Sequence, residues 1–127
     1  MSAPIYLYTG PEAGERKEAV EKIKKTLRKD FGDLEEYNFY ASETSVNEFM
    51  SVLQNESLFS SATCVVIKNA EVIKKKEDIE TIVNWVSSVN TQSSVLILTS
   101  DSVSIDTKIE KAVPTQNKKI FWEMFED

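Results

Sequence analysis

Short apolar runs alternate with longer amphipathic stretches along the whole chain. Five of the runs are rich in β-branched or aromatic residues and are bounded by Gly, Ser or Asn, which is typical of β-strands. They cover residues 5–8, 35–40, 64–67, 95–98 and 119–122. The runs at 64–67 and 95–98 are apolar at every position, as expected for interior strands of a parallel sheet.

Between these runs, apolar residues recur at steps of three and four, the spacing of a helix with one buried face. A first helix is predicted from about residue 12 to 31, ended by Gly32. Ser45 and Glu48 form a capping-box pattern that begins a second helix. Further helices are predicted over residues 72–89 and 107–112. The apolar positions of the first two helices are Ala19, Val20, Ile23, Leu27, Phe31, Val46, Phe49, Met50 and Leu53.

Strands and helices that alternate in this way predict an α/β fold. The expected architecture has three layers, with a five-stranded, mostly parallel sheet flanked by helices. A chain of 127 residues fits one domain, here residues 1–127. Residues 54–61 interrupt the second helical pattern and are predicted to connect that helix to the third strand. Exposed-looking apolar residues at 123–127 suggest a domain boundary, with further domains in the intact protein.

The charge balance disfavours a nucleic-acid-binding surface. The net charge is −6, from 15 Lys and Arg against 21 Asp and Glu, whereas phosphate binding requires clustered positive charge. The run Lys74, Lys75 and Lys76 is followed by two acidic residues and is interpreted as the solvated face of a helix. With one cysteine, Cys64, in an apolar run, and no stretch that could cross a membrane, the sequence predicts a cytoplasmic protein.

The loop after the first strand resembles a phosphate-binding loop only in part. Such a loop needs a second glycine, then a lysine, then a hydroxyl residue. If the pattern starts at Gly10, those three places hold Glu15, Arg16 and Lys17. The carboxylate and the missing hydroxyl predict a degenerate loop without a nucleotide cofactor. An active P-loop-type nucleotide-binding domain, an NTPase or a kinase, is the alternative.

Other catalytic groups are sparse. The chain contains no histidine, the commonest general base and metal ligand, and no metal site is expected. Asp101 and Asp106 could suggest a carboxylate pair, but Asp near strand ends is more often a turn or cap residue. Glu71 is displaced from the place where a nucleotide hydrolase carries an acidic residue. The sequence therefore predicts a protein that is not an enzyme.

The connector at residues 54–61 places Leu58 and Phe59 side by side among polar residues. Two interpretations remain open on the residues alone. In the first, one side chain fills the top of the core while the other packs beneath a helix. In the second, the pair protrudes as an apolar hot spot that a partner's pocket receives.

Three segments together resemble the opening domain of the DNA polymerase III delta subunit family: residues 5–10, residues 57–59 and residues 65–71. The resemblance spans nearly the whole chain. It implies an AAA+-like domain of the P-loop NTPase type that has lost its phosphate loop and has no catalytic activity of its own. Besides this family and an active nucleotide-binding domain, a purely structural α/β module is a third interpretation of the sequence.

The resemblance also implies a site and partners. Leu58 and Phe59 would insert into a pocket of the ring-shaped sliding clamp (the beta subunit), with Ser57 and Gln54 in the same motif. The spacing from Gln54 is one residue longer than in the commonest form of that motif. Other clamp loader subunits would be contacted through lid and collar domains that this chain lacks, and DNA only indirectly. Binding would favour the open ring, and ATP would be bound by other subunits.

Overall fold

A computed structural model describes residues 4–54, 62–89 and 93–122. The strands are β1 (Ile5–Thr9), β2 (Leu34–Tyr40), β3 (Ala62–Lys68), β4 (Ser94–Ser100) and β5 (Lys118–Ile120). The helices are α1 (Ala13–Phe31), α2 (Val46–Gln54), α3 (Lys76–Ser88) and α4 (Thr107–Ala112), with short 3-10 turns η1 (Ala70–Val72) and η2 (Thr115–Asn117).

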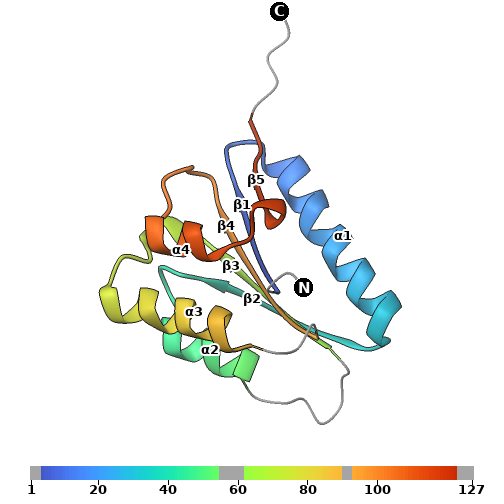
Figure 1. Cartoon of the computed structure of the whole chain (residues 1–127). Helices are drawn as coiled ribbons and strands as arrows, with labels where there is room; N and C mark the ends of the chain where they lie inside the picture. Colours follow the sequence, from blue (N-terminus) through green and yellow to red (C-terminus); the bar gives the residue numbers. More distant parts are fainter. Residues whose placement is uncertain (1–3, 55–61, 90–92, 123–127) are drawn as a thin grey trace, which may run out of the picture.

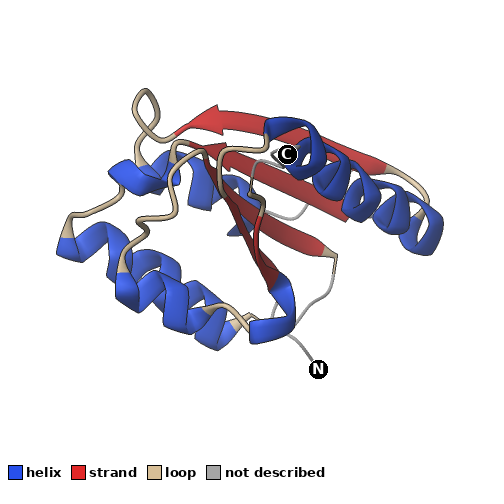
Figure 2. Ribbon diagram, turned by 90° about the horizontal axis from the view of Figure 1, so that it is seen from above, coloured by secondary structure: helices blue, strands red, loops and turns tan. Residues whose placement is uncertain are grey.

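The five strands form one parallel sheet in the order β2-β3-β4-β1-β5. Figures 1 and 2 show α1 on one face of this sheet and α2, α3 and α4 on the other. The three-layer α/β architecture with a five-stranded parallel sheet is thereby confirmed. The central strands β3 and β4 are buried at nearly every position because helices cover both faces, whereas the edge strand β2 alternates between half-buried and exposed positions.

Two apolar clusters hold the layers together. The larger one lies between the sheet and helices α2, α3 and α4, and the smaller one lies beneath α1. In α1, Val20 and Leu27 face the sheet, and Gly32 ends the helix with a positive φ of 90°. Side-chain caps begin two helices as the sequence suggests: the Ser45 hydroxyl accepts from the Glu48 N–H at 3.2 Å, and Asp106 caps α4.

The third helix is shorter than the apolar spacing predicts. Ile73 is buried, but it lies in an extended connection after η1, and Val72 is 46% exposed. Lys74 and Lys75 are exposed, as expected, yet they precede the helix; only Lys76 belongs to α3. Ile73 is buried at a spacing that fits a helix although its backbone is extended. The predicted helix start at residue 72 is therefore wrong.

Two smaller boundaries also differ. Gln54 is the last residue of α2 and not the first residue of a connector. The fifth strand ends at Ile120, so Phe121 and Trp122, predicted within it, lie beyond its end; Phe121 is buried and Trp122 is 61% exposed. Residues 123–127, predicted to mark a domain boundary, lie outside the described residues.

Candidate functional site

The sheet topology places a crevice at the carboxyl ends of β1 and β4. From β1 the chain runs through α1 to β2 at one edge, whereas from β4 it runs through α4 past β1 to β5 at the other edge. In open α/β sheets, ligands bind where neighbouring strands send their connections in opposite directions. The loop after β1, in which the sequence resembles a phosphate-binding loop only in part, faces the loop that begins at Asp101.

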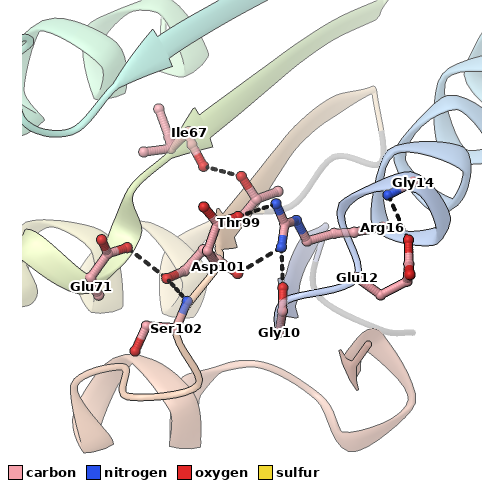
Figure 3. A network of polar contacts seen from close by, with 10 residues as sticks. Gly10, Glu12, Gly14, Arg16, Ile67, Glu71, Thr99, Asp101 and Ser102 are labelled. Atoms are coloured by element: carbon pink, nitrogen blue, oxygen red, sulfur yellow. Dashed lines mark hydrogen bonds and ion pairs between the residues drawn. The ribbon is translucent and has the colours of Figure 1, made fainter. Parts of the chain in front are cut away.

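Arg16 joins the two sides of this crevice. Its Nη1 donates to the carbonyls of Gly10 and Ser100, the latter at 3.2 Å, and its Nη2 pairs with the Asp101 carboxylate. Figure 3 shows the side chain reaching from α1 toward Gly10 and Asp101. Where a phosphate-binding lysine would point at a ligand, this arginine is engaged inside the protein.

The backbone N–H groups of the loop are engaged as well. Gly10 N donates to the Ser100 carbonyl and Glu12 N to the Phe121 carbonyl, both at 3.0 Å. The Gly14 N–H donates to the Glu12 carboxylate at 3.0 Å, and the Arg16 N–H to the Glu12 carbonyl at 3.2 Å. A phosphate loop works by presenting such donors to phosphate oxygens. Here these four already have protein acceptors.

The acidic residues near the crevice also have structural partners. Ser100 donates its hydroxyl hydrogen to Glu71 at 2.6 Å, and its oxygen accepts from the Ser102 N–H at 3.0 Å. Asp106 accepts from the N–H groups of Lys108 and Ile109 at the start of α4. Asp106 is therefore a cap residue, as expected, whereas Asp101 pairs with Arg16 and caps no helix in the described part of the chain. Among the described residues, no group of three or more His, Cys, Asp or Glu could hold a metal ion.

Of the four residues predicted to bind the clamp, the structure describes only Gln54. Gln54 is exposed at the end of α2. Ser57, Leu58 and Phe59 lie outside the described residues, so their predicted role stays a prediction. Sequence reasoning missed the Arg16–Asp101 pair, because the residues are far apart in the chain and only the parallel pairing of β1 with β4 brings them together.

A separate cluster of charges lies under α1. Lys24 is only 5% exposed; its Nζ lies 3.0 Å from one Glu36 carboxylate oxygen and 3.5 Å from Glu21, and Arg28 pairs with the other oxygen of Glu36. Burial alone would raise the pKa of Glu36, but the hydrogen bonds from Lys24 and Arg28 outweigh it and lower that pKa. Nearby, burial raises the pKa of the Cys64 thiol to about 12, so this cysteine is an inert core residue.

Comparison with known proteins agrees with the resemblance read from the sequence. The chain matches the family model described as "DNA polymerase III, delta subunit" over residues 6–122. Its fold is similar to that of the Bacillus subtilis DNA clamp loader delta protein (YqeN), with a TM-score of 0.71 and 21% sequence identity. That similarity covers 95% of this chain and 39% of the Bacillus protein, so the chain spans well under half of its length.

No curated protein sequence matches the chain. In the described part of the chain, none of the helices is long and apolar enough to cross a membrane. The family model extends from the first strand to the last described residue. The protein therefore belongs to the DNA polymerase III delta subunit family.

Proposed function

We propose that this chain is the N-terminal, AAA+-like domain of a clamp loader delta subunit. In this role it binds the DNA sliding clamp (the beta subunit) through Leu58 and Phe59 and helps open the ring during DNA replication. The observation that carries the proposal is the family match over residues 6–122. The domain works in the cytoplasm, meets DNA only indirectly, and joins the other loader subunits through lid and collar domains outside this chain.

The ends of the segment that carries the pair are well anchored. Leu53, one residue before Gln54, is buried against the α2 side of the sheet. After the segment, the Ala62 N–H donates to the Asp33 carbonyl at 3.1 Å, and Ala62 is in register with Leu34 of β2. Ala62, which begins β3, lies at the amino edge of the sheet, whereas the crevice lies at the carboxyl ends of the strands.

The energetics fit an apolar anchor assisted by neighbours. Full burial of a Leu or a Phe contributes about 1.5–3 kcal/mol each. A micromolar complex corresponds to about 8 kcal/mol, so the pair supplies much of the affinity but not all of it. Gln54, exposed at the end of α2, and Ser57 are suited to polar contacts at the rim of the clamp pocket. Ring opening requires in addition that the domain binds the open clamp more tightly than the closed one.

The crevice supports a role without catalysis. Arg16 and the N–H groups of Gly10, Glu12 and Gly14 are already engaged within the protein, and position 17 offers an ammonium in place of the magnesium-binding hydroxyl. ATP would then be bound by other subunits of the loader. Calorimetry of the whole chain with Mg-ATP tests this part: we expect no binding heat at millimolar nucleotide, and saturable heat would favour the alternative of an active nucleotide-binding domain.

The decisive experiment is a titration of the purified sliding clamp with the whole chain and with a Leu58→Ala, Phe59→Ala variant. We expect the double variant to weaken binding by at least about a hundredfold, because two buried anchors are truncated. The matched control is Val103→Ala, Ile120→Ala, which removes two exposed apolar side chains near the carboxyl edge. It should bind like the unmodified chain.

A urea unfolding curve of each variant separates binding from folding. Unchanged clamp affinity in the Leu58, Phe59 variant would refute the proposed contact. A large loss of stability in that variant would assign the pair to the core and would also count against the proposal. Gln54→Ala is expected to weaken binding by less than about tenfold, since it removes one rim contact.

A further inference from the structure

A groove of about 390 Å³ opens on the α1 face of the sheet, at the carboxyl ends of β2, β3 and β4. Its lining is more basic than the rest of this acidic chain. Four cationic side chains line it against two carboxylates, in a protein with a net charge of −6. The charged lining residues are Arg16, Lys17, Lys24, Lys68, Glu21 and Asp101.

Two of these cations have no carboxylate partner among the residues that the structure describes. Lys24 is engaged by Glu36 and Glu21. Lys17 forms no ion pair with a described residue, and the Lys68 ammonium lies 5.4 Å from the centre of the Tyr40 ring, a cation–π contact that leaves its charge uncompensated. Both ammonium groups are therefore available to an anion in the groove.

Arg16 and Asp101 are unequal partners in their ion pair. The Arg16 side chain is only 13% exposed and is held by the carbonyls of Gly10 and Ser100, which fix Nη1 and leave Nη2 directed at the carboxylate. The Asp101 side chain is 81% exposed. An exposed carboxylate can leave such a pair at little cost, because surface ion pairs are worth about 0–1 kcal/mol. The guanidinium stays in place whether or not Asp101 does.

We propose that Arg16, Lys17 and Lys68 form a binding site for a phosphate-type oxyanion. In the free protein the Asp101 carboxylate occupies this site by pairing with Arg16. The inference does not depend on the proposed clamp binding, because it uses none of the residues assigned to that contact. The ligand is a small oxyanion without a metal ion, such as pyrophosphate, since the loop offers neither the hydroxyl nor the N–H groups that a magnesium nucleotide needs.

The test is a pyrophosphate titration of the whole chain followed by amide chemical shifts of residues 10–17 and 99–102. The unmodified chain should bind weakly, in the millimolar range, because the ligand competes with Asp101. Asp101→Asn removes the competing charge and keeps the shape of the side chain. It should bind pyrophosphate up to about fivefold more tightly, as expected when a competing ion pair worth at most about 1 kcal/mol is removed from Arg16.

Three controls decide whether the gain comes from this site. Glu80→Gln, on the exposed surface of α3, changes the net charge equally and should gain nothing. Adding Arg16→Gln to Asp101→Asn should abolish the gain in pyrophosphate affinity. Adding Lys17→Gln and Lys68→Gln to Asp101→Asn should reduce that gain while Arg16 stays unchanged. An Asp101→Asn affinity equal to that of the unmodified chain, or to that of Glu80→Gln, would overturn the proposal.

Discussion

The guanidinium of Arg16 and the carboxylate of Asp101 form an ion pair that joins the first turns of α1 to the loop after β4. The same guanidinium donates to the carbonyls of Gly10 and Ser100. One side chain thus bridges the two sides of the crevice in which an α/β sheet of this topology would hold a ligand. Stability of the crevice therefore depends on the arginine far more than on its exposed carboxylate partner.

Arg16→Gln is expected to lower the free energy of unfolding by about 1–3 kcal/mol, because two carbonyls at the crevice lose a charged donor. Asp101→Asn should change it by less than about 1 kcal/mol, as is usual for an exposed ion pair. Urea denaturation followed by circular dichroism measures both. Equal losses in the two variants would mean that the ion pair, and not the carbonyl contacts, supplies the stability.

Gly10→Ala is expected to be strongly destabilising. Gly10 has a φ of 108°, and an added Cβ would lie 2.3 Å from the Phe121 carbonyl oxygen, so both the Gly10 backbone and the segment just after β5 would have to shift. We expect a loss of at least about 2 kcal/mol in thermal or urea unfolding.

Gly14→Ala is the matched control for that substitution. Gly14 is helical, and its added Cβ would meet only the flexible carboxylate end of Glu12, at 3.2 Å. Alanine favours the helix over glycine by up to about 1 kcal/mol, so this variant should be neutral or slightly stabilised. A Gly10→Ala variant as stable as Gly14→Ala would contradict the close approach of the Phe121 backbone to Gly10.

Glu36 should make the stability of the domain acid-sensitive. Its pKa is lowered in the folded protein, against the effect of burial, by Lys24 and Arg28. A lowered carboxylate pKa stabilises the fold above the unfolded value of about 4.3 and loses that contribution as the pH falls through the folded value. Unfolding curves between pH 7 and pH 3 should show the loss below about pH 4.5.

The Glu36→Gln variant should lose stability already at pH 7, by about 1–3 kcal/mol, because Lys24 stays buried with a weaker partner. The free energy of unfolding of this variant should also depend less on pH over the acidic range. Glu35→Gln on the same strand is the control, since the Glu35 carboxylate accepts a hydrogen bond from a neutral phenol, Tyr37, and pairs with no ammonium in the described part of the chain. If the Glu36→Gln variant loses as much stability in acid as the unmodified protein, other carboxylates cause the acid dependence.

Cys64 should resist alkylation in the folded protein. Burial raises the pKa of its thiol to about 12, so almost no thiolate exists at pH 8. We expect modification by iodoacetamide to follow global unfolding and to be fast only in denaturant. Because the pKa of the thiol is raised by folding, the neutral thiol stabilises the fold fully below about pH 9. This contribution to the free energy of unfolding is lost as the pH rises toward 12. Rapid native-state labelling at pH 8 would contradict the burial.

The amino-acid sequence determined most of the fold of this protein. Periodicity identified the five strands and the helix at 107–112, and the Ser45 and Asp106 caps were readable because capping depends on neighbours within one turn. It failed at Ile73, where a buried side chain on extended backbone has the same spacing as a helical one. The resemblance in sequence to the delta family also agrees with the family match.

Only the tertiary structure decided how the degenerate loop is used. The sequence showed that Glu15, Arg16 and Lys17 do not fit a phosphate loop, but not that Arg16 reaches Asp101 and Ser100, some 85 residues away in the chain. Such contacts depend on strand order, and β1 lies next to β4 for reasons of packing that no local pattern records. Local chemistry is readable from neighbours in the chain, whereas a site built across a sheet exists only once the strands have paired.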